Sequence, residues 1–248
     1  MFRSRRRKRR SRAAVRSCAS SSRAIRKPER VTRVRVKVCC IADRDEAALA
    51  IAAGADAVGL VSAMPSGPGV IGDVLIADIA RSVPPPVASF LLTSRVDAAS
   101  IVAQHATCAT TVLQLCDHVP LAELRQLRAQ LPAVKLVQVI HVIDAQSVDE
   151  ALAVAPLVDA LLLDSGNQRR AVKELGGTGR THDWRLSRRI RERCGLPLFL
   201  AGGLTPANVA EAVATVEPFG VDLCNGVRSD GRLDAAKLRA FFAALALH

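Results

Sequence analysis

The 248-residue chain is 50% hydrophobic, so it is long and apolar enough to bury a core without cross-links, and a wholly disordered chain is excluded. No stretch approaches 18 uninterrupted apolar residues, which excludes a transmembrane helix and a membrane partner. Aromatic residues make up only 3% and Tyr is absent, so a stacking platform for single-stranded nucleic acid is not expected.

The net charge of +12 belongs to the N-terminus. Residues 1–36 hold 15 Lys and Arg and one acid, Glu29, whereas residues 37–248 hold 20 Lys and Arg against 22 Asp and Glu. We expect residues 1–33 to be a disordered Arg/Ser-rich tail, because like charges at this density repel. Three interpretations stay open: a transit peptide, an arm for nucleic acid or another anionic surface, and, ranked first, a mis-assigned start codon with the true start near Val31.

The seven cysteines favour a reducing environment. Their number is odd, no C-x-x-C spacing occurs, and no signal-peptide hydrophobic segment precedes them. We therefore expect free thiols and a cytoplasmic location.

From Val34 onward, short β-branched or aliphatic runs alternate with segments of helical period. Strands separated by helices pair in parallel, and eight such units in about 210 residues predict an α/β fold, a single-domain (β/α)8 TIM barrel over residues 34–248. An open doubly wound sheet is the alternative, but C-C-I-A-D-R after the first strand is not a dinucleotide fingerprint. The predicted strands are Val34–Cys39, Ala57–Val61, Pro86–Leu92, Thr111–Leu115, Lys135–His141, Ala160–Asp164, Pro197–Leu200 and Asp222–Asn225.

The first strand ends in two cysteines. Alternation along a strand places Lys37 and Cys39 inside the barrel and turns Cys40 away from it. A thiol at the barrel mouth is suited to act as a base or nucleophile, although a small core residue is the alternative. Strand 8 adjoins strand 1 in a closed barrel, so we predict a contact between Lys37 and Asp222, since a buried cation needs a partner.

The fourth and sixth strands bring polar groups to the same mouth. Gln114 lies near the end of strand 4, and Asp164 ends the apolar run of strand 6. A buried carboxylate costs free energy unless it is partnered or functional, so Asp164 is a candidate acid opposite the Cys39 thiol, with a cap of a helix or loop as the alternative. The long loop 165–182 that follows is a candidate lid.

Glycines follow the seventh and eighth strands. Gly202-Gly203 precede Thr205-Pro206, which we expect to open a helix, and Asn225-Gly226 stand after strand 8. Loops in these positions with a helix N-terminus are the usual phosphate site of this fold, although tight turns alone are the alternative.

Together these motifs resemble the phosphoribosylanthranilate isomerase family of tryptophan biosynthesis. The matching segments are K-V-C-C-I-A (37–42), A-G-A-D-A-V-G-L (53–60), L-Q-L-C-D (113–117), D-A-L-L-L-D-S (159–165), G-G-T-G-R-T-H-D-W (176–184), L-A-G-G-L-T-P-A-N-V (200–209) and G-V-D-L-C-N-G-V (220–227). The resemblance covers the chain from about Val34 onward.

The resemblance implies an Amadori rearrangement without cofactor or metal. N-(5-phosphoribosyl)anthranilate, a small phosphosugar amine, becomes a 1-deoxyribulose amine. Cys39 would remove the proton from C2, and Asp164 would protonate the ring oxygen. Gly202, Gly203, Asn225 and Gly226 would hold the phosphate, and Gln114 and Asp222 are further candidates for substrate binding. We expect a monomer or a homodimer.

Departures from the family pattern affect the aromatic-acid end. The Arg expected to face the anthranilate carboxylate is replaced by Gly69, and Arg228, where the family has an acid, is a candidate substitute. The family's Gly after the catalytic Cys is Cys40, and the His after Gln-Leu is Cys116.

Three alternatives follow from these departures. The first is a paralogue that isomerises another phosphoribosylamine. The second is a catalytically silent barrel that serves as a binding or scaffold protein, with the tail as its contact arm. The third is a thiol or zinc site built from Cys39, Cys116 and Cys224 with His118 or His141, although these residues lack short-range metal-ligand spacing.

Overall fold

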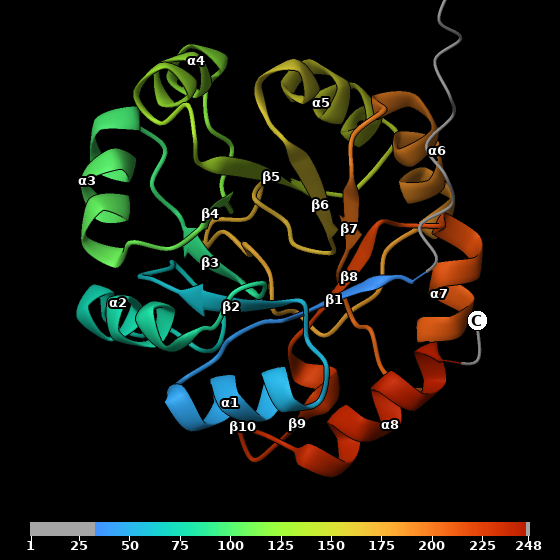
Figure 1. The fold of residues 1–248 in the computed structure, drawn as a ribbon. Coiled ribbons are helices and arrows are strands. Elements are labelled where there is room, and N and C mark those ends of the chain that lie inside the picture. Colours follow the sequence, from blue (N-terminus) through green and yellow to red (C-terminus); the bar gives the residue numbers. More distant parts are fainter. Residues whose placement is uncertain (1–32, 247–248) are drawn as a thin grey trace, which may run out of the picture. The chain divides into compact units, whose positions relative to one another are not determined.

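A computed structural model of the chain describes residues 33–246. Within them, eight parallel strands close into a barrel in sequence order, with β1 hydrogen-bonded to both β2 and β8 (Figure 1). This confirms the predicted (β/α)8 barrel. The predicted tail lies outside the described residues, apart from Arg33. The strands are β1 (Arg35–Val38), β2 (Ala57–Val61), β3 (Ala88–Thr93), β4 (Val112–Leu115), β5 (Lys135–His141), β6 (Ala160–Asp164), β7 (Leu198–Leu200) and β8 (Gly220–Leu223).

Helices surround the barrel (Figure 1). No helix in the described range exceeds 11 residues, and none has the length and apolar character needed to cross a membrane. A 3-10 turn, Ala155–Leu157, follows α5, another, Asn225–Val227, follows β8, and a small hairpin (β9, Arg228–Ser229; β10, Arg232–Leu233) precedes α8. The helices are α1 (Arg44–Ala52), α2 (Asp73–Ser82), α3 (Ala98–Cys108), α4 (Leu121–Gln130), α5 (Gln146–Val154), α6 (Trp184–Cys194), α7 (Val209–Val216) and α8 (Ala235–Leu245).

Two apolar clusters hold these layers together. One lies between the strands and the helices and contains residues such as Leu91 and Phe241. The other includes side chains such as Phe90 and Phe199, whose rings meet edge to face with centroids 6.0 Å apart. Strand alternation separates the two clusters, because successive side chains point to opposite faces of the barrel wall.

Several predicted boundaries are wrong in detail. Strand β3 begins at Ala88, two residues after the predicted start, and β8 runs from Gly220 to Leu223, two residues before the predicted range at each end. Helix α7 begins at Val209, and the segment after Thr205-Pro206 is a turn in which the Thr205 N–H donates to Asn208 Oδ1 at 2.8 Å. The Asn208 side chain therefore organises this loop, a role that helix propensity does not reveal.

Candidate active site

A cavity of about 280 Å³ opens at the carboxyl ends of the strands. All eight candidate residues named from the sequence line it, although they come from five different strands and the loops after them. They are Cys39, Gln114, Asp164, Gly202, Gly203, Asp222, Asn225 and Gly226. Parallel strands deliver their carboxyl ends to one face of the barrel, which is why residues so distant in sequence meet here.

Cys39 enters the cavity directly after β1, above a buried ion pair. Lys37 Nζ lies 2.8 Å from Asp222 Oδ2, and the predicted contact between strands 1 and 8 is confirmed. Burial alone would lower the pKa of Lys37, but the negative charge and hydrogen bond of Asp222, with a contribution from Cys39, raise it above its ordinary value. Lys37 is therefore a fixed cation near the Cys39 thiol.

A glycine in the neighbouring strand leaves room for both groups. A Cβ atom at Gly59 in β2 would lie 2.9 Å from Cys39 Sγ and 3.0 Å from Lys37 Nζ. Any larger residue would displace the thiol or the ammonium group. Gly59 thus sets the position of Cys39 through the absence of a side chain.

Asp164 ends β6 and is 8% exposed. Its Oδ1 accepts a hydrogen bond from the N–H of Ser165 at 2.7 Å, which fixes the carboxyl group at the edge of the cavity. A Cβ at Gly176, in the loop between β6 and α6, would lie 2.8 Å from Asp164 Oδ2, so this loop packs directly on the carboxyl group. The loop also provides Leu175 to Gly179 of the cavity lining, and its role as a lid stays a prediction.

The glycines after β7 allow a close approach of the backbone. Gly202 and Gly203 have φ of +85° and +61°, which side chains rarely adopt. A Cβ at Gly203 would lie 2.7 Å from the carbonyl carbon of Arg180. On the next strand, Asn225 Nδ2 donates to the Gly177 carbonyl at 3.0 Å, which joins the loop after β8 to the lid.

Two buried acceptors in the cavity lining have no partner among the described residues. They are Gln114 Oε1 and Asp222 Oδ1, from β4 and β8. A buried polar atom without a partner is costly, so these oxygens are suited to accept hydrogen bonds from ligand hydroxyl groups.

Cys40 contradicts the alternation expected from the sequence, since it lines the cavity instead of turning away. Its φ is +61°, so the strand pattern ends before it and its side chain is redirected. A Cβ at Gly69 would lie 2.5 Å from Cys40 Cβ. The two departures from the family pattern therefore compensate sterically, because the side chain gained at Cys40 occupies the space next to the residue reduced to Gly69.

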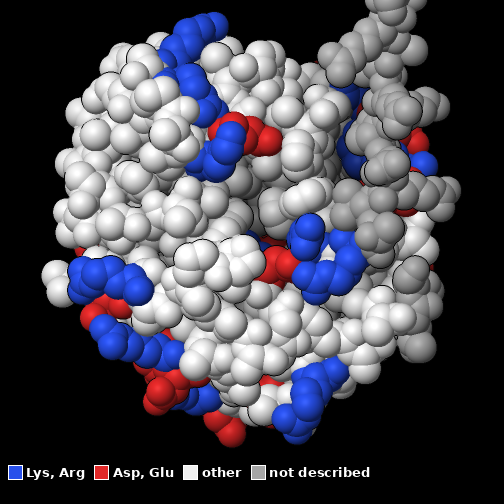
Figure 2. Space-filling view, in the orientation of Figure 1, with Lys and Arg blue, Asp and Glu red and all other residues white. Residues whose placement is uncertain are grey.

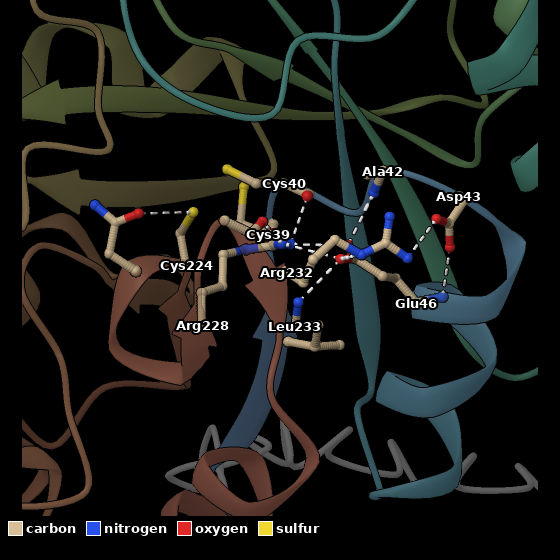
Figure 3. A network of polar contacts seen from close by, with 11 residues as sticks. Cys39, Cys40, Ala42, Asp43, Glu46, Cys224, Arg228, Arg232 and Leu233 are labelled. Carbon is tan, nitrogen blue, oxygen red and sulfur yellow. Dashed lines mark hydrogen bonds and ion pairs between the residues drawn. The ribbon is translucent and has the colours of Figure 1, made fainter.

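Arg228 does not line the cavity, and the prediction that it replaces the missing cation is wrong. Its guanidinium group binds Glu46 at 3.1 Å and the carbonyl oxygens of Cys39 and Cys40 at 3.3 and 2.5 Å (Figure 3). Sequence position places Arg228 after β8 but does not reveal Glu46 as its partner.

The thiols beside Cys39 differ in acidity. A hydrogen bond shared with Cys40, together with the positive charge of Arg228, lowers the pKa of the Cys224 thiol, and the same hydrogen bond raises the pKa of Cys40. Burial raises the pKa of Cys116. No group of three or more His, Cys, Asp and Glu side chains in residues 33–246 is arranged to hold a metal ion, so the zinc alternative finds no ligand set in the described chain.

Four further residues of the loop after β2 were not named as site candidates from the sequence. Met64, Ser66, Gly67 and Pro68 line the cavity. Their loop is tied to the lid, since Ser66 Oγ donates to the Lys173 carbonyl at 2.7 Å. The signal that could have found them was the family resemblance, which places Gly69 of the same loop at the aromatic-acid end of the substrate, because the residue types of this loop alone suggest no particular chemistry.

The fold defines the class of this molecule as a (β/α)8 barrel, and one glycine-lined cavity at the carboxyl ends of its strands holds a thiol, Cys39, and a carboxyl group, Asp164. Comparison with known proteins gives the family. Residues 36–244 match the N-(5'phosphoribosyl)anthranilate (PRA) isomerase family, and this chain belongs to it. The chain is accordingly an isomerase.

Individual relatives cover most of the chain. An N-(5'-phosphoribosyl)anthranilate isomerase of Haloferax volcanii is 41% identical over 214 residues, which cover 85% of this chain and 92% of that protein. One of Halobacterium salinarum is 39% identical and covers 84% of this chain and 94% of that protein. The structure of phosphoribosyl anthranilate isomerase from Thermotoga maritima has a TM-score of 0.74 and 27% identity, covering 87% of this chain and 100% of that chain.

A further solved structure of phosphoribosyl anthranilate isomerase contains reduced 1-(o-carboxyphenylamino)-1-deoxyribulose 5-phosphate. It has a TM-score of 0.72 and 26% identity to this chain, covering 87% of this chain and 100% of that one.

Proposed function

We propose that Cys39 and Asp164 are the general base and general acid of an Amadori rearrangement of N-(5'-phosphoribosyl)anthranilate in tryptophan biosynthesis. The observation that carries this proposal is that the two side chains line one cavity, from β1 and β6. The substrate is a small phosphosugar amine. The related structure with reduced 1-(o-carboxyphenylamino)-1-deoxyribulose 5-phosphate supports a ligand of this chemistry.

The reaction proceeds by ring opening, removal of the C2 proton and a final tautomerisation. Asp164 donates a proton to the ring oxygen, the bond from C1 to that oxygen breaks, and the amine nitrogen supplies electrons to form a C1–N iminium group. The Cys39 thiolate then removes the proton from C2, which gives an enolamine. The enolamine then tautomerises to the 2-keto product: C1 gains a proton and the C2 hydroxyl group loses one, so no external oxidant or reductant is required.

The phosphate is assigned to the loops after β7 and β8. Gly202 and Gly203 allow the backbone to approach the ligand, and Asn225 and Gly226 form the adjacent wall. Gln114 and Asp222 accept hydrogen bonds from the sugar hydroxyls through their unpaired oxygens. The aromatic ring is assigned to the side of the cavity lined by Val61, Met64, Leu92, Cys116 and Leu175.

Two further proposals concern the cellular location and the oligomeric state of the enzyme. The six cysteines within the described residues are free thiols, which supports the expected cytoplasmic location. A monomer or a homodimer stays the proposed assembly.

The proposal is tested by following the loss of anthranilate-adduct fluorescence with purified variants. Cys39→Ser and Asp164→Asn are each expected to lower kcat by about 100- to 10,000-fold, because each removes one proton-transfer group. Cys194→Ser is the matched control, since Cys194 ends α6 outside the cavity and its loss should leave kcat unchanged. Wild-type turnover by either active-site variant would remove that residue from the mechanism.

The same assay separates the paralogue and scaffold alternatives. A paralogue would turn over a phosphoribosylamine without the anthranilate carboxylate faster than the anthranilate substrate. A silent scaffold would turn over neither compound, and the two active-site variants would match the wild type.

A further inference from the structure

Arg228, the first residue of β9, reaches the turn that carries the candidate base (Figure 3). Its side chain is 8% exposed. Nη2 lies 2.5 Å from the carbonyl oxygen of Cys40 and 3.3 Å from that of Cys39. A single guanidinium group therefore binds two consecutive carbonyl groups beside the Cys39 thiol.

Glu46 holds the guanidinium group from the other side. It belongs to the first turn of α1 and is 4% exposed. Its carboxylate accepts from Arg228 Nη1 at 3.2 Å and Nη2 at 3.1 Å, and from the backbone N–H groups of Ala42 at 3.1 Å and Leu233 at 2.9 Å. A buried ion pair is maintained when further hydrogen bonds satisfy its polar atoms, and these four contacts meet that condition for Glu46.

The turn needs such support because of Cys40. A residue with a side chain is disfavoured at φ +61° and persists where the surrounding structure over-determines the backbone. The carbonyls on both sides of this strained position accept hydrogen bonds from Arg228. Loss of the guanidinium group would free the turn to relax, and the adjacent Cys39 would move with it.

We propose that Arg228, oriented by Glu46, is a positioning residue that holds Cys39 in register with the substrate by binding the carbonyl groups of Cys39 and Cys40. This inference rests on the proposed role of Cys39 as the base. It also connects two departures from the family pattern. Arg228 stands where the family has an acid, Cys40 stands where it has a Gly, and Arg228 binds the carbonyl group of Cys40.

The test compares Arg228→Met, Arg228→Lys and the control Arg232→Met in steady-state kinetics and thermal melting. Arg232 also approaches Glu46, at 3.7 Å, and binds Asp43 at 3.0 Å, but it is exposed and, unlike Arg228, is not hydrogen-bonded to the carbonyl groups of Cys39 and Cys40 among the described residues. Arg228→Met is expected to lower kcat by about 100-fold, the effect of a 1 Å misplacement of a reacting group, with KM little changed. Arg228→Lys should recover part of kcat, because an ammonium group retains one of the donors, and Arg232→Met should match the wild type.

A second variant keeps the test informative if Arg228→Met does not fold. Glu46→Gln keeps the shape of the side chain and removes its charge, and it should also lower kcat at unchanged KM. Wild-type kcat in folded Arg228→Met, a rise in KM alone, or a loss explained entirely by the unfolded fraction would each overturn the inference. Turnover by Cys39→Ser at the wild-type rate would instead refute the role of Cys39 as the base. This result distinguishes failure of the proposed function from failure of the positioning role of Arg228.

Discussion

Lys37 shows how one buried charge organises the site. It is fully buried, and its ammonium group lies 5.3 Å from the centroid of the Phe90 ring and 2.8 Å from Asp222 Oδ2. Because the ammonium group uses one oxygen of Asp222, the other is left for a ligand. The pair therefore links the barrel interior to the cavity, and both partners are needed to keep charge balanced there.

Removal of one partner of this pair should be costly. Lys37→Met is expected to lower the free energy of unfolding by about 3–5 kcal/mol, since it leaves the Asp222 charge buried without compensation. The double variant Lys37→Met with Asp222→Leu should recover much of that loss, and denaturant unfolding measures both. Because the pKa of Lys37 is raised, its charge should contribute fully below the ordinary value of 10.5 and lose its contribution as the pH rises through the folded-state pKa. Burial raises the pKa of Asp222, so protonation of Asp222 should remove the ion pair at acidic pH. A single variant as stable as the wild type would contradict this account.

The turn after β1 and the loop after β2 are two elements that the sequence treats as independent and the structure packs together. Gly69 has φ +78° and lies against Cys40, whereas Gly72 at the start of α2 has φ −74° and open space around its Cα. Of these two glycines, only Gly69 is therefore constrained both by its backbone conformation and by a neighbouring side chain.

A pair of alanine substitutions distinguishes these positions. Gly69→Ala is expected to destabilise the protein by about 1–3 kcal/mol, because the new Cβ would overlap Cys40 at a left-handed position. Gly72→Ala should be close to neutral. Cys40→Gly combined with Gly69→Ala should recover the part caused by overlap with the Cys40 side chain, but not the part caused by its Cα at 2.9 Å, and melting temperatures would show the difference. Equal effects of the two single substitutions would contradict the packing argument.

How far the sequence predicts the site also depends on these elements. The period of two along β1 and β8 was sufficient to predict Lys37 against Asp222, because both residues lie within regular strands. The period of two failed at Cys40, because the chain there leaves the strand and adopts a left-handed backbone conformation, which side-chain alternation does not predict. Arg228 was misplaced for a related reason, since its partner Glu46 is 182 residues away and no local pattern connects them.

At the scale of the whole molecule, the barrel is electrically balanced and the excess charge lies elsewhere. From residue 37 onward the chain has 20 Lys and Arg, and Arg33 and Arg35 bring the total from residue 33 to 22, against 22 Asp and Glu. Figure 2 shows Lys and Arg beside Asp and Glu around much of one face, with uncharged residues predominating between them. The barrel alone therefore lacks the net positive charge that draws a protein to an anionic polymer.

Deletion of residues 1–32 should separate catalysis from binding to anionic surfaces. The described barrel strands, core and cavity lining lie within residues 33–246, so we expect the truncated chain to retain kcat, KM and melting temperature within error. The full chain should bind a nonspecific DNA duplex with an affinity that falls steeply as salt rises, because Arg and Lys release counterions from phosphates, and the truncated chain should not bind. Fluorescence anisotropy at several salt concentrations measures this difference. Reduced turnover after the deletion would show that the tail contributes to the site, and equal DNA binding by both forms would locate the anionic-surface contact on the barrel.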